Sequence, residues 1–235
     1  MIRRCHILAL AALALTGLAG CNKLPGKPTK ADIELAPSQV TDFNLLYGQN
    51  CAGCHGDKGQ GNGALALANP VYLAIADDAV LTKAIAQGVP NSLMPAFAES
   101  AGGFLTDAQV GILVKEMRTR WSKPNALQGA TPPPYAATGA GDPTRGAAVF
   151  SQSCAQCHNT AEGSGDKVAT IVDGSFLALV TNQYLRTTVI AGRPELGHPD
   201  WRGVKDQPLT PEQVTDVVSW LVSQRPEYPG RPYQK

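Results

Sequence analysis

Apolar side chains recur at helical spacing in two stretches, each of which closes one half of the chain. In the first, Thr106 and Gln109 form a capping box. An apolar stripe at i, i+3, i+4 and i+7 follows it: Val110, Leu113, Val114 and Met117. In the second, Thr210, Pro211 and Gln213 precede the same pattern at Val214, Val217, Val218 and Leu221. The two patterns predict two capped helices, each with one face in a core.

Each half also opens with a predicted helix. Residues 41–50 place Phe43, Leu46, Tyr47 and Asn50 at helical spacing. Asp142-Pro143 supplies a capping residue followed by a proline suited to the first helical position. We therefore expect two domains, residues 41–121 and 143–224. The Pro- and Gly-rich residues 122–142 are predicted to be a semi-extended linker, and residues 225–235 a tail.

The two halves are an internal repeat. Cys51-Ala52-Gly53-Cys54-His55 returns as Cys154-Ala155-Gln156-Cys157-His158, with an aromatic residue four positions before each first cysteine. Residues 88–95 and 192–199 share the form G-x-P-x-x-x-[Met or His]-Pro. Met94 follows His55 by 39 residues, and His198 follows His158 by 40. One architecture is used twice.

C-x-x-C-H is the attachment sequence of a c-type haem. On one helical turn, Cys51 and Cys54, or Cys154 and Cys157, lie on the same face and can form thioethers with one porphyrin. The adjacent His55 or His158 then becomes the proximal iron ligand. The alternatives are one zinc bound by both pairs, or two redox disulfides. The wide separation of the pairs and the histidine after each favour two haems.

Met94 and His198 occupy matching positions and are candidates for the sixth ligand of the two irons. The proline after each keeps the residue extended, on a loop able to face the iron. The alternatives are a core methionine and an exposed loop histidine. Met117 lies in the apolar stripe of a predicted helix, so we interpret it as a core residue.

The N-terminus has the pattern of an export signal. Arg3 and Arg4 precede an apolar run over residues 7–18, which is too short to span a bilayer. Leu18-Ala19-Gly20-Cys21 then resembles a bacterial lipobox. We expect a signal peptide over residues 1–20, lipidation of Cys21, and a tether over residues 21–40. An ordinary signal peptide cut nearby is the alternative. The protein would be periplasmic or extracytoplasmic and anchored to the membrane by lipid.

Composition narrows the classes of partner. The 235 residues carry a formal charge of +1 and include 6% aromatic side chains. This balance gives no basic surface for nucleic acid. It also leaves little aromatic bulk for two cores of this size, a deficit that covalent haem would offset.

Each half resembles a class I cytochrome c, over residues 41–121 and 143–224. Paired on one chain, the halves resemble di-haem cytochromes of the cytochrome c4 kind, or the cytochrome modules of membrane oxidoreductases. The resemblance implies an all-α fold of two tandem domains. It also implies thioethers at Cys51, Cys54, Cys154 and Cys157, and iron ligands at His55, His158 and Met94. His198 departs from the family pattern, which has methionine there.

The function that follows is single-electron transfer between periplasmic or membrane redox partners, without a catalytic site. The alternatives are a di-haem redox enzyme of the peroxidase kind, or the cytochrome subunit of a larger membrane dehydrogenase or oxidase. An enzyme would need one iron that is open or can be opened. Thiosulfate-oxidising di-haem enzymes use a cysteine at the active iron, and no cysteine remains for that role after processing.

Overall fold

The structure, a computed structural model, describes residues 26, 29, 34–158, 170–204 and 207–227. The predicted signal peptide, Cys21 and most of the predicted tether lie outside the described residues. The chain divides into two compact units, residues 1–39 and 40–235. No described helix has both the length and the apolar character needed to cross a bilayer. Among the described residues the fold is helical, with isolated bridges and no strand, which confirms the all-α prediction.

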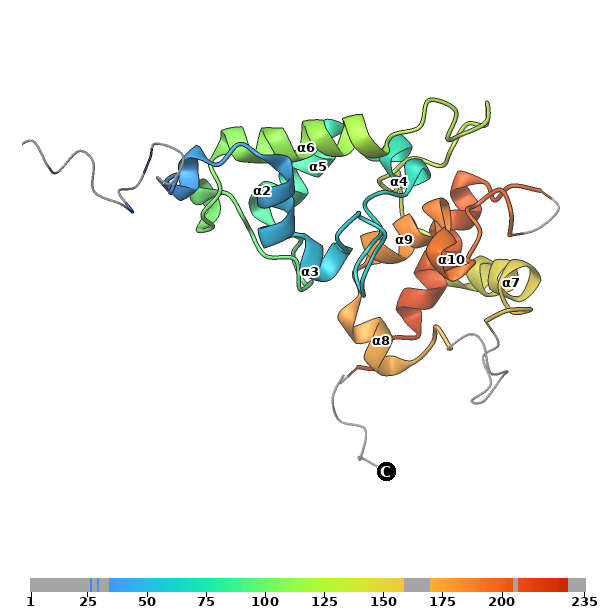
Figure 1. Cartoon of the computed structure of the whole chain (residues 1–235). Coiled ribbons are helices and arrows are strands. Elements are labelled where there is room, and N and C mark those ends of the chain that lie inside the picture. The colour runs from blue at the N-terminus through green and yellow to red at the C-terminus, as the bar shows by residue number, and fades with distance from the viewer. Residues whose placement is uncertain (1–25, 27–28, 30–33, 159–169, 205–206, 228–235) are drawn as a thin grey trace, which may run out of the picture. The chain divides into compact units, whose positions relative to one another are not determined.

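The first half of the described chain consists of helices joined by loops (Figure 1). They are η3 (Pro37–Gln39), α2 (Phe43–Asn50), α3 (Ala52–His55), α4 (Pro70–Ile75), α5 (Asp78–Gln87), η4 (Glu99–Ala101) and α6 (Asp107–Trp121). The second half repeats the long elements. They are α7 (Pro143–Ser153), α8 (Gly174–Leu179), α9 (Asn182–Ala191), η5 (Pro194–Leu196) and α10 (Pro211–Ser223).

Both predicted capping boxes are present. The hydroxyls of Thr106 and Thr210 accept from the backbone N–H of Gln109 and Gln213, and each glutamine side chain accepts from its threonine N–H. Both apolar stripes are buried throughout: Val110, Leu113, Val114, Met117, Val214, Val217, Val218 and Leu221. The sequence therefore predicted α6 and α10 correctly, including the core position of Met117.

Four helices were not predicted, and each begins at a polar cap. The side chains of Asn69, Asp77, Asp173 and Thr181 accept backbone N–H groups at the starts of α4, α5, α8 and α9. Asn69 and Asp173 are 104 residues apart, as are Asp77 and Thr181. Helices of six to ten residues leave only short apolar patterns, so the caps were the available signal.

The opening and closing helices cross closely in the second half. A Cβ on Gly146 of α7 would lie 2.0 Å from the backbone oxygen of Asp216 in α10, so only glycine allows this approach. In the first half Phe43 stands at the same distance before its cysteine motif. Phe43, Tyr47 and Trp121 there form a ring cluster, with centroids 5.3–5.8 Å apart. A bulky side chain at this register replaces the direct backbone approach.

Residues 122–142 contain no helix, yet they do not behave as a simple spacer. Pro133 is fully buried. The carbonyls of Pro134 and Tyr135 accept hydrogen bonds from the guanidinium of Arg186 in α9, a residue only 3% exposed. We call residues 133–135 the strap. Because a buried cation needs all its N–H groups satisfied, Arg186 fixes the strap against α9.

Candidate haem sites

Each C-x-x-C-H motif forms the expected helical turn. In the first, the N–H groups of Cys54 and His55 donate to the carbonyl of Cys51, at 3.2 and 2.9 Å. In the second, Cys157 and His158 donate to the carbonyl of Cys154, at 3.1 and 2.8 Å. The first cysteine of each pair is half-buried and the second is exposed. Both thiols of a pair therefore project from one turn, next to the histidine.

The orientation of His55 is fixed by a backbone carbonyl. Its Nδ1 lies 2.8 Å from the oxygen of Leu65 and donates to it, which leaves the lone pair on Nε2 for a metal. Burial lowers the pKa of His55, so the neutral ligand form is favoured near pH 7. The counterpart of Leu65 in the second half falls within residues 159–169, outside the described part of the chain.

A glycine loop folds back over the first motif. Gly56, Gly59, Gly61 and Gly63 all have positive φ, so the loop needs glycine for its conformation. The N–H of Gly61 donates to the carbonyl of His55, at 2.8 Å. Gly59 also lies beneath the Trp121 ring, which a Cβ would approach within 2.9 Å. The loop is therefore a folded part of the site.

The loops that carry Met94 and His198 have the same construction. The N–H of Val89 donates to the carbonyl of Met94, and the N–H of Arg193 donates to the carbonyl of His198, both at 3.0 Å. Each loop leaves its helix at a glycine with positive φ, Gly88 or Gly192. The sequence missed Ser92, whose Oγ donates to the Val89 carbonyl and accepts from the Met94 N–H. A serine two residues before the candidate ligand was the signal.

The structure brings His158 and His198 together. Their ring centroids are 5.7 Å apart and the ring planes meet at 43°. A metal–imidazole bond is about 2 Å long, so two rings bound on opposite sides of one metal have centroids about 6 Å apart. The observed separation is close to that value. Burial and the neighbouring His158 lower the pKa of His198, which favours its neutral form as well.

The residues present fit haem better than zinc. Among the described residues, no group of three His, Cys, Asp or Glu side chains is placed to hold a metal ion. The two C-x-x-C pairs therefore do not share a zinc site. No disulfide joins the four cysteines of the motifs, so all four sulfurs are available for thioethers. In a c-type haem the cysteine sulfurs bond to the porphyrin and not to a metal, so haem attachment needs no such group of metal-binding side chains.

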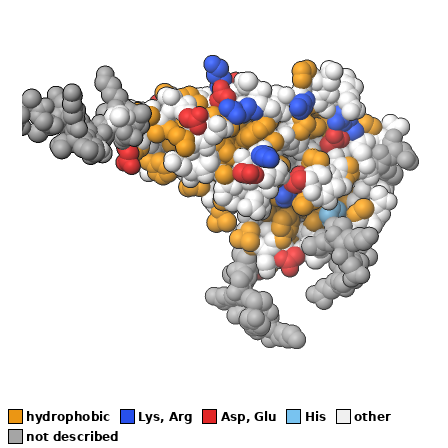
Figure 2. Space-filling view, viewed as in Figure 1, with side chains coloured by type: hydrophobic (Ala, Val, Ile, Leu, Met, Phe, Trp, Pro, Cys, Tyr) orange, Lys and Arg blue, Asp and Glu red, His pale blue; other side chains and the backbone are white. Residues whose placement is uncertain are grey.

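The two arginines that flank the His198 loop both have protein partners. Arg193 pairs with Glu195 at 2.6 Å and donates to the Tyr184 hydroxyl. Arg202 pairs with Asp200, also at 2.6 Å. Acidic and basic side chains are interspersed on the face seen in Figure 2. This mixture agrees with the near-zero net charge of the sequence.

Comparison with known proteins identifies the family. The family model described as "Cytochrome C oxidase, cbb3-type, subunit III" matches residues 38–115 and 141–221. The "Cbb3-type cytochrome c oxidase subunit CcoP" of Azospirillum sp. (strain B510) is 28% identical over 197 residues. The match covers 79% of this chain and 55% of that relative, so the chain spans about half of the relative's length.

A solved structure also aligns with the chain. It is titled "Kuenenia stuttgartiensis reducing HAO-like protein complex Kustc0457/Kustc0458". The alignment covers 83% of this chain and 100% of that one, with a TM-score of 0.44 and 17% identity.

The family match falls on both C-x-x-C-H repeats and on both loops that carry the candidate distal ligands. The chain is thus a di-haem c-type cytochrome, with two covalently bound haems. Because the match extends over well more than half of its residues, the chain belongs to the family of cytochrome c oxidase, cbb3-type, subunit III.

Proposed function

We propose that the protein relays single electrons through two six-coordinate irons, one held by His55 and Met94 and the other by His158 and His198. The observation that carries the proposal is the facing pair of imidazoles, His158 and His198, with centroids 5.7 Å apart. An iron with protein ligands on both faces offers no position for a substrate. This arrangement favours electron transfer over peroxidase chemistry.

Each residue has a separate task in this proposal. Cys51 and Cys54, and likewise Cys154 and Cys157, hold the haem edge by thioethers. The Leu65 carbonyl keeps the His55 ring in one tautomer. Haem, when bound, supplies a one-electron iron couple. The two loops that start at Gly88 and Gly192 fix the positions of the distal ligands, so the protein should rearrange little when an iron gains or loses an electron.

The ligand sets give the relay a direction. A methionine thioether raises the reduction potential relative to a second histidine. We therefore infer that the His158/His198 centre has the lower potential, and that electrons enter there and leave by way of the His55/Met94 centre. A redox titration followed by absorbance should resolve two potentials. A His55/Met94 centre with the lower potential would overturn the inferred direction.

Electron paramagnetic resonance on the oxidised protein tests the ligand assignment. Two low-spin signals are expected, one of the His/Met and one of the bis-His kind.

Carbon monoxide added to the reduced protein distinguishes an electron relay from an enzyme. Slow or negligible binding at both centres supports the relay, whereas rapid and complete binding at one centre would favour a peroxidase-like enzyme.

We also propose that the protein works at the outer face of a membrane, held there by lipid on Cys21, as the cytochrome part of a membrane-bound oxidase or dehydrogenase. The lipobox-like residues 18–21 and the family support this placement. A Cys21→Ser variant should move from the membrane to the soluble fraction with its haem content intact. Unchanged membrane association of that variant would refute the lipid anchor.

A further inference from the structure

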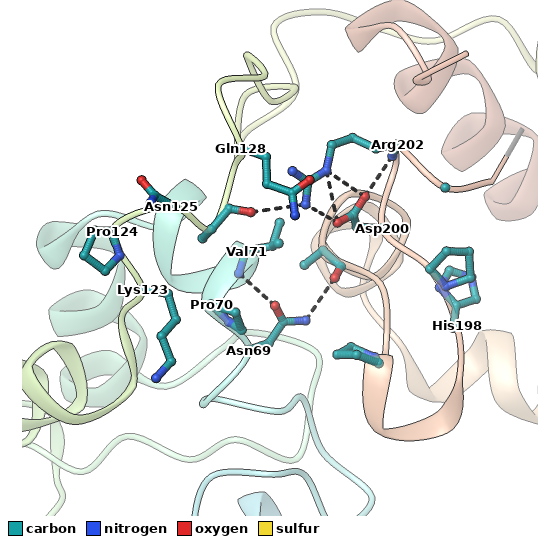
Figure 3. A pocket seen from close by; sticks show the side chains of 15 residues that line it. Asn69, Pro70, Val71, Lys123, Pro124, Asn125, Gln128, His198, Asp200 and Arg202 are labelled. Atoms are coloured by element: carbon teal, nitrogen blue, oxygen red, sulfur yellow. Dashed lines mark hydrogen bonds and ion pairs between the residues drawn. The ribbon is translucent and has the colours of Figure 1, made fainter. Parts of the chain in front are cut away.

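Two side-chain contacts join the loop that carries His198 to segments more than 70 residues earlier in the chain. At the loop's entry, Asn69 Nδ2 donates to the carbonyl of Ala191 at 2.9 Å and to that of Gly192 at 3.4 Å. Beyond its end, Arg202 Nη2 donates to the carbonyl of Ala126 at 3.1 Å. Figure 3 shows both contacts on the wall of one cavity of about 820 Å³.

Asn69 uses both ends of its amide. Its Oδ1 accepts from the N–H groups of Val71 and Tyr72 and caps α4, while its Nδ2 reaches the end of α9. The side chain is buried, with 4% of the residue exposed. A buried hydrogen bond of this kind is costly to break, because its carbonyl partners lose their donor without gaining water. Asn69 thus connects the first half directly to the start of the His198 loop.

The repeat supplies a built-in comparison. Asp173, 104 residues after Asn69, caps α8 by accepting from the N–H of Phe176 at 2.8 Å. Asp173 is exposed, and this cap is its role among the described contacts. Capping therefore requires only an acceptor. The amide at position 69 adds a donor, and that donor points at the other half of the chain.

The Asn69 contact is connected to His198 through the backbone of one short loop that is closed at both ends. Gly192 has φ +67°, and a Cβ there would lie 2.5 Å from the Pro199 oxygen, so the loop's two ends touch. Arg193 and His198 exchange backbone hydrogen bonds, each at 3.0 Å. A shift of the Ala191 and Gly192 carbonyls therefore displaces the residue that carries the imidazole.

We propose that Asn69 is a positioning residue for the second iron: it holds the entry of the His198 loop, so that the first half of the chain sets how firmly His198 stays on that iron. This inference depends on the proposed ligation by His198. It assigns a role in the second site to a residue of the first half. None of the described contacts joins Asn69 directly to His158 or His198.

The Asn69→Asp variant separates the two roles of the side chain. Aspartate retains the acceptor that caps α4, but it presents a carboxylate oxygen to the carbonyls of Ala191 and Gly192. With the bond replaced by repulsion, His198 should leave the reduced iron roughly 10-fold more readily, a factor typical of one lost buried hydrogen bond. Carbon monoxide binding at the second centre should accelerate by about the same factor.

Asp173→Asn is the matched control, since it changes the same cap position, from which no contact among the described residues crosses to the other half. Its carbon monoxide kinetics and resonance signals should equal those of the wild type. The His55/Met94 centre of each variant serves as an internal reference and should not change. If Asn69→Asp folds poorly, Asn69→Ser keeps a capping oxygen without adding charge and should show the same direction of change.

The outcomes distinguish the inference from the function on which it rests. If the wild type lacks a bis-His signal, the proposed ligation by His198 is wrong. If the wild type has that signal and Asn69→Asp matches it in both resonance and carbon monoxide kinetics, the role of Asn69 is refuted while the proposed function stands. Acceleration confined to the second centre of the position-69 variants supports the inference.

Discussion

The α carbon of Gly192 lies against the backbone of Pro199, so closely that a Cβ at position 192 would come within 2.5 Å of the proline oxygen. Gly88 has the same relationship to the Met94 oxygen, at 2.7 Å. In both loops, the first residue after the preceding helix, α5 or α9, must be glycine for the loop to close. The positive φ at each position adds to this requirement.

Substitution of these glycines should therefore affect one centre at a time. We expect Gly192→Ala to weaken ligation by His198 and Gly88→Ala to weaken ligation by Met94, each visible as a loss of the matching low-spin signal. Gly102→Ala is the control: it also has positive φ, 87°, but its Cβ meets no atom within 4 Å. It should lower stability by about 1 kcal/mol and leave both signals intact. Equal loss of both signals in either loop variant would contradict this prediction.

Exchange of the distal ligand should shift one potential. His198→Met gives the second iron the ligand set proposed for the first, so its potential should rise by on the order of 100 mV. The two reduction potentials would then lie closer to each other or coincide. The first potential provides the internal control. A fall in the second potential, or no change, would show that His198 is not bound to that iron.

A buried carboxylate links α7 to α10. Asp216, with its side chain 4% exposed, accepts from Arg145 at 2.7 Å and from the N–H of Asp142 at 2.7 Å. The Arg145 hydrogen bond holds the pKa of Asp216 below its usual range. Its stabilising contribution is thus complete above the ordinary aspartate pKa of about 4 and is lost as the pH falls through the lowered folded value.

Asp216→Asn should consequently destabilise the protein at neutral pH, by about 1–3 kcal/mol in denaturant unfolding. The difference from the wild type should shrink when the same measurement is made at pH 3. Glu212→Gln is the matched control, because Glu212 faces the same arginine at 3.5 Å with its side chain 75% exposed. It should change stability by less than about 0.5 kcal/mol. A deficit in Asp216→Asn that grows as the pH falls would refute the assignment.

The strap offers a further test. Arg186→Gln removes the guanidinium hydrogen bonds to the Pro134 and Tyr135 carbonyls and leaves the Tyr135 carbonyl only the one from Gln183, which should cost about 2 kcal/mol in unfolding free energy. Limited proteolysis within residues 133–140 should accelerate. Arg225→Gln is a suitable control, since Arg225 also binds backbone carbonyls but joins α8 instead of the strap. It should leave cleavage within residues 133–140 unchanged.

Much of the fold could be predicted because its determinants lie close together in sequence. Thr106 with Gln109 and Thr210 with Gln213 mark the starts of α6 and α10, and the stripes that follow them are buried as expected. The order of motif, loop and capped helix in each half also follows from local patterns. The four shorter helices were missed, although Asn69 and Asp77 are recognisable capping residues.

The rest depends on contacts between distant residues. Nothing near Asn69 indicates that its amide reaches Ala191, and nothing near Arg186 indicates that it binds the strap. The sequence did align Met94 with His198, and the structure places His198 opposite His158. The hydrogen bond of His55 to Leu65 was not anticipated, since a backbone acceptor has no signature in residue type.

Gly146 and Phe43 occupy one register of a repeated design and impose different helix contacts. Helix α7 packs against α10 backbone to backbone, so its amide protons should exchange with deuterium only when the second half opens as a whole. The amide protons of α2, which packs through aromatic rings, should exchange through smaller, local openings. The two haem sites, although built from one repeated sequence pattern, would therefore lie in protein surroundings that differ in rigidity.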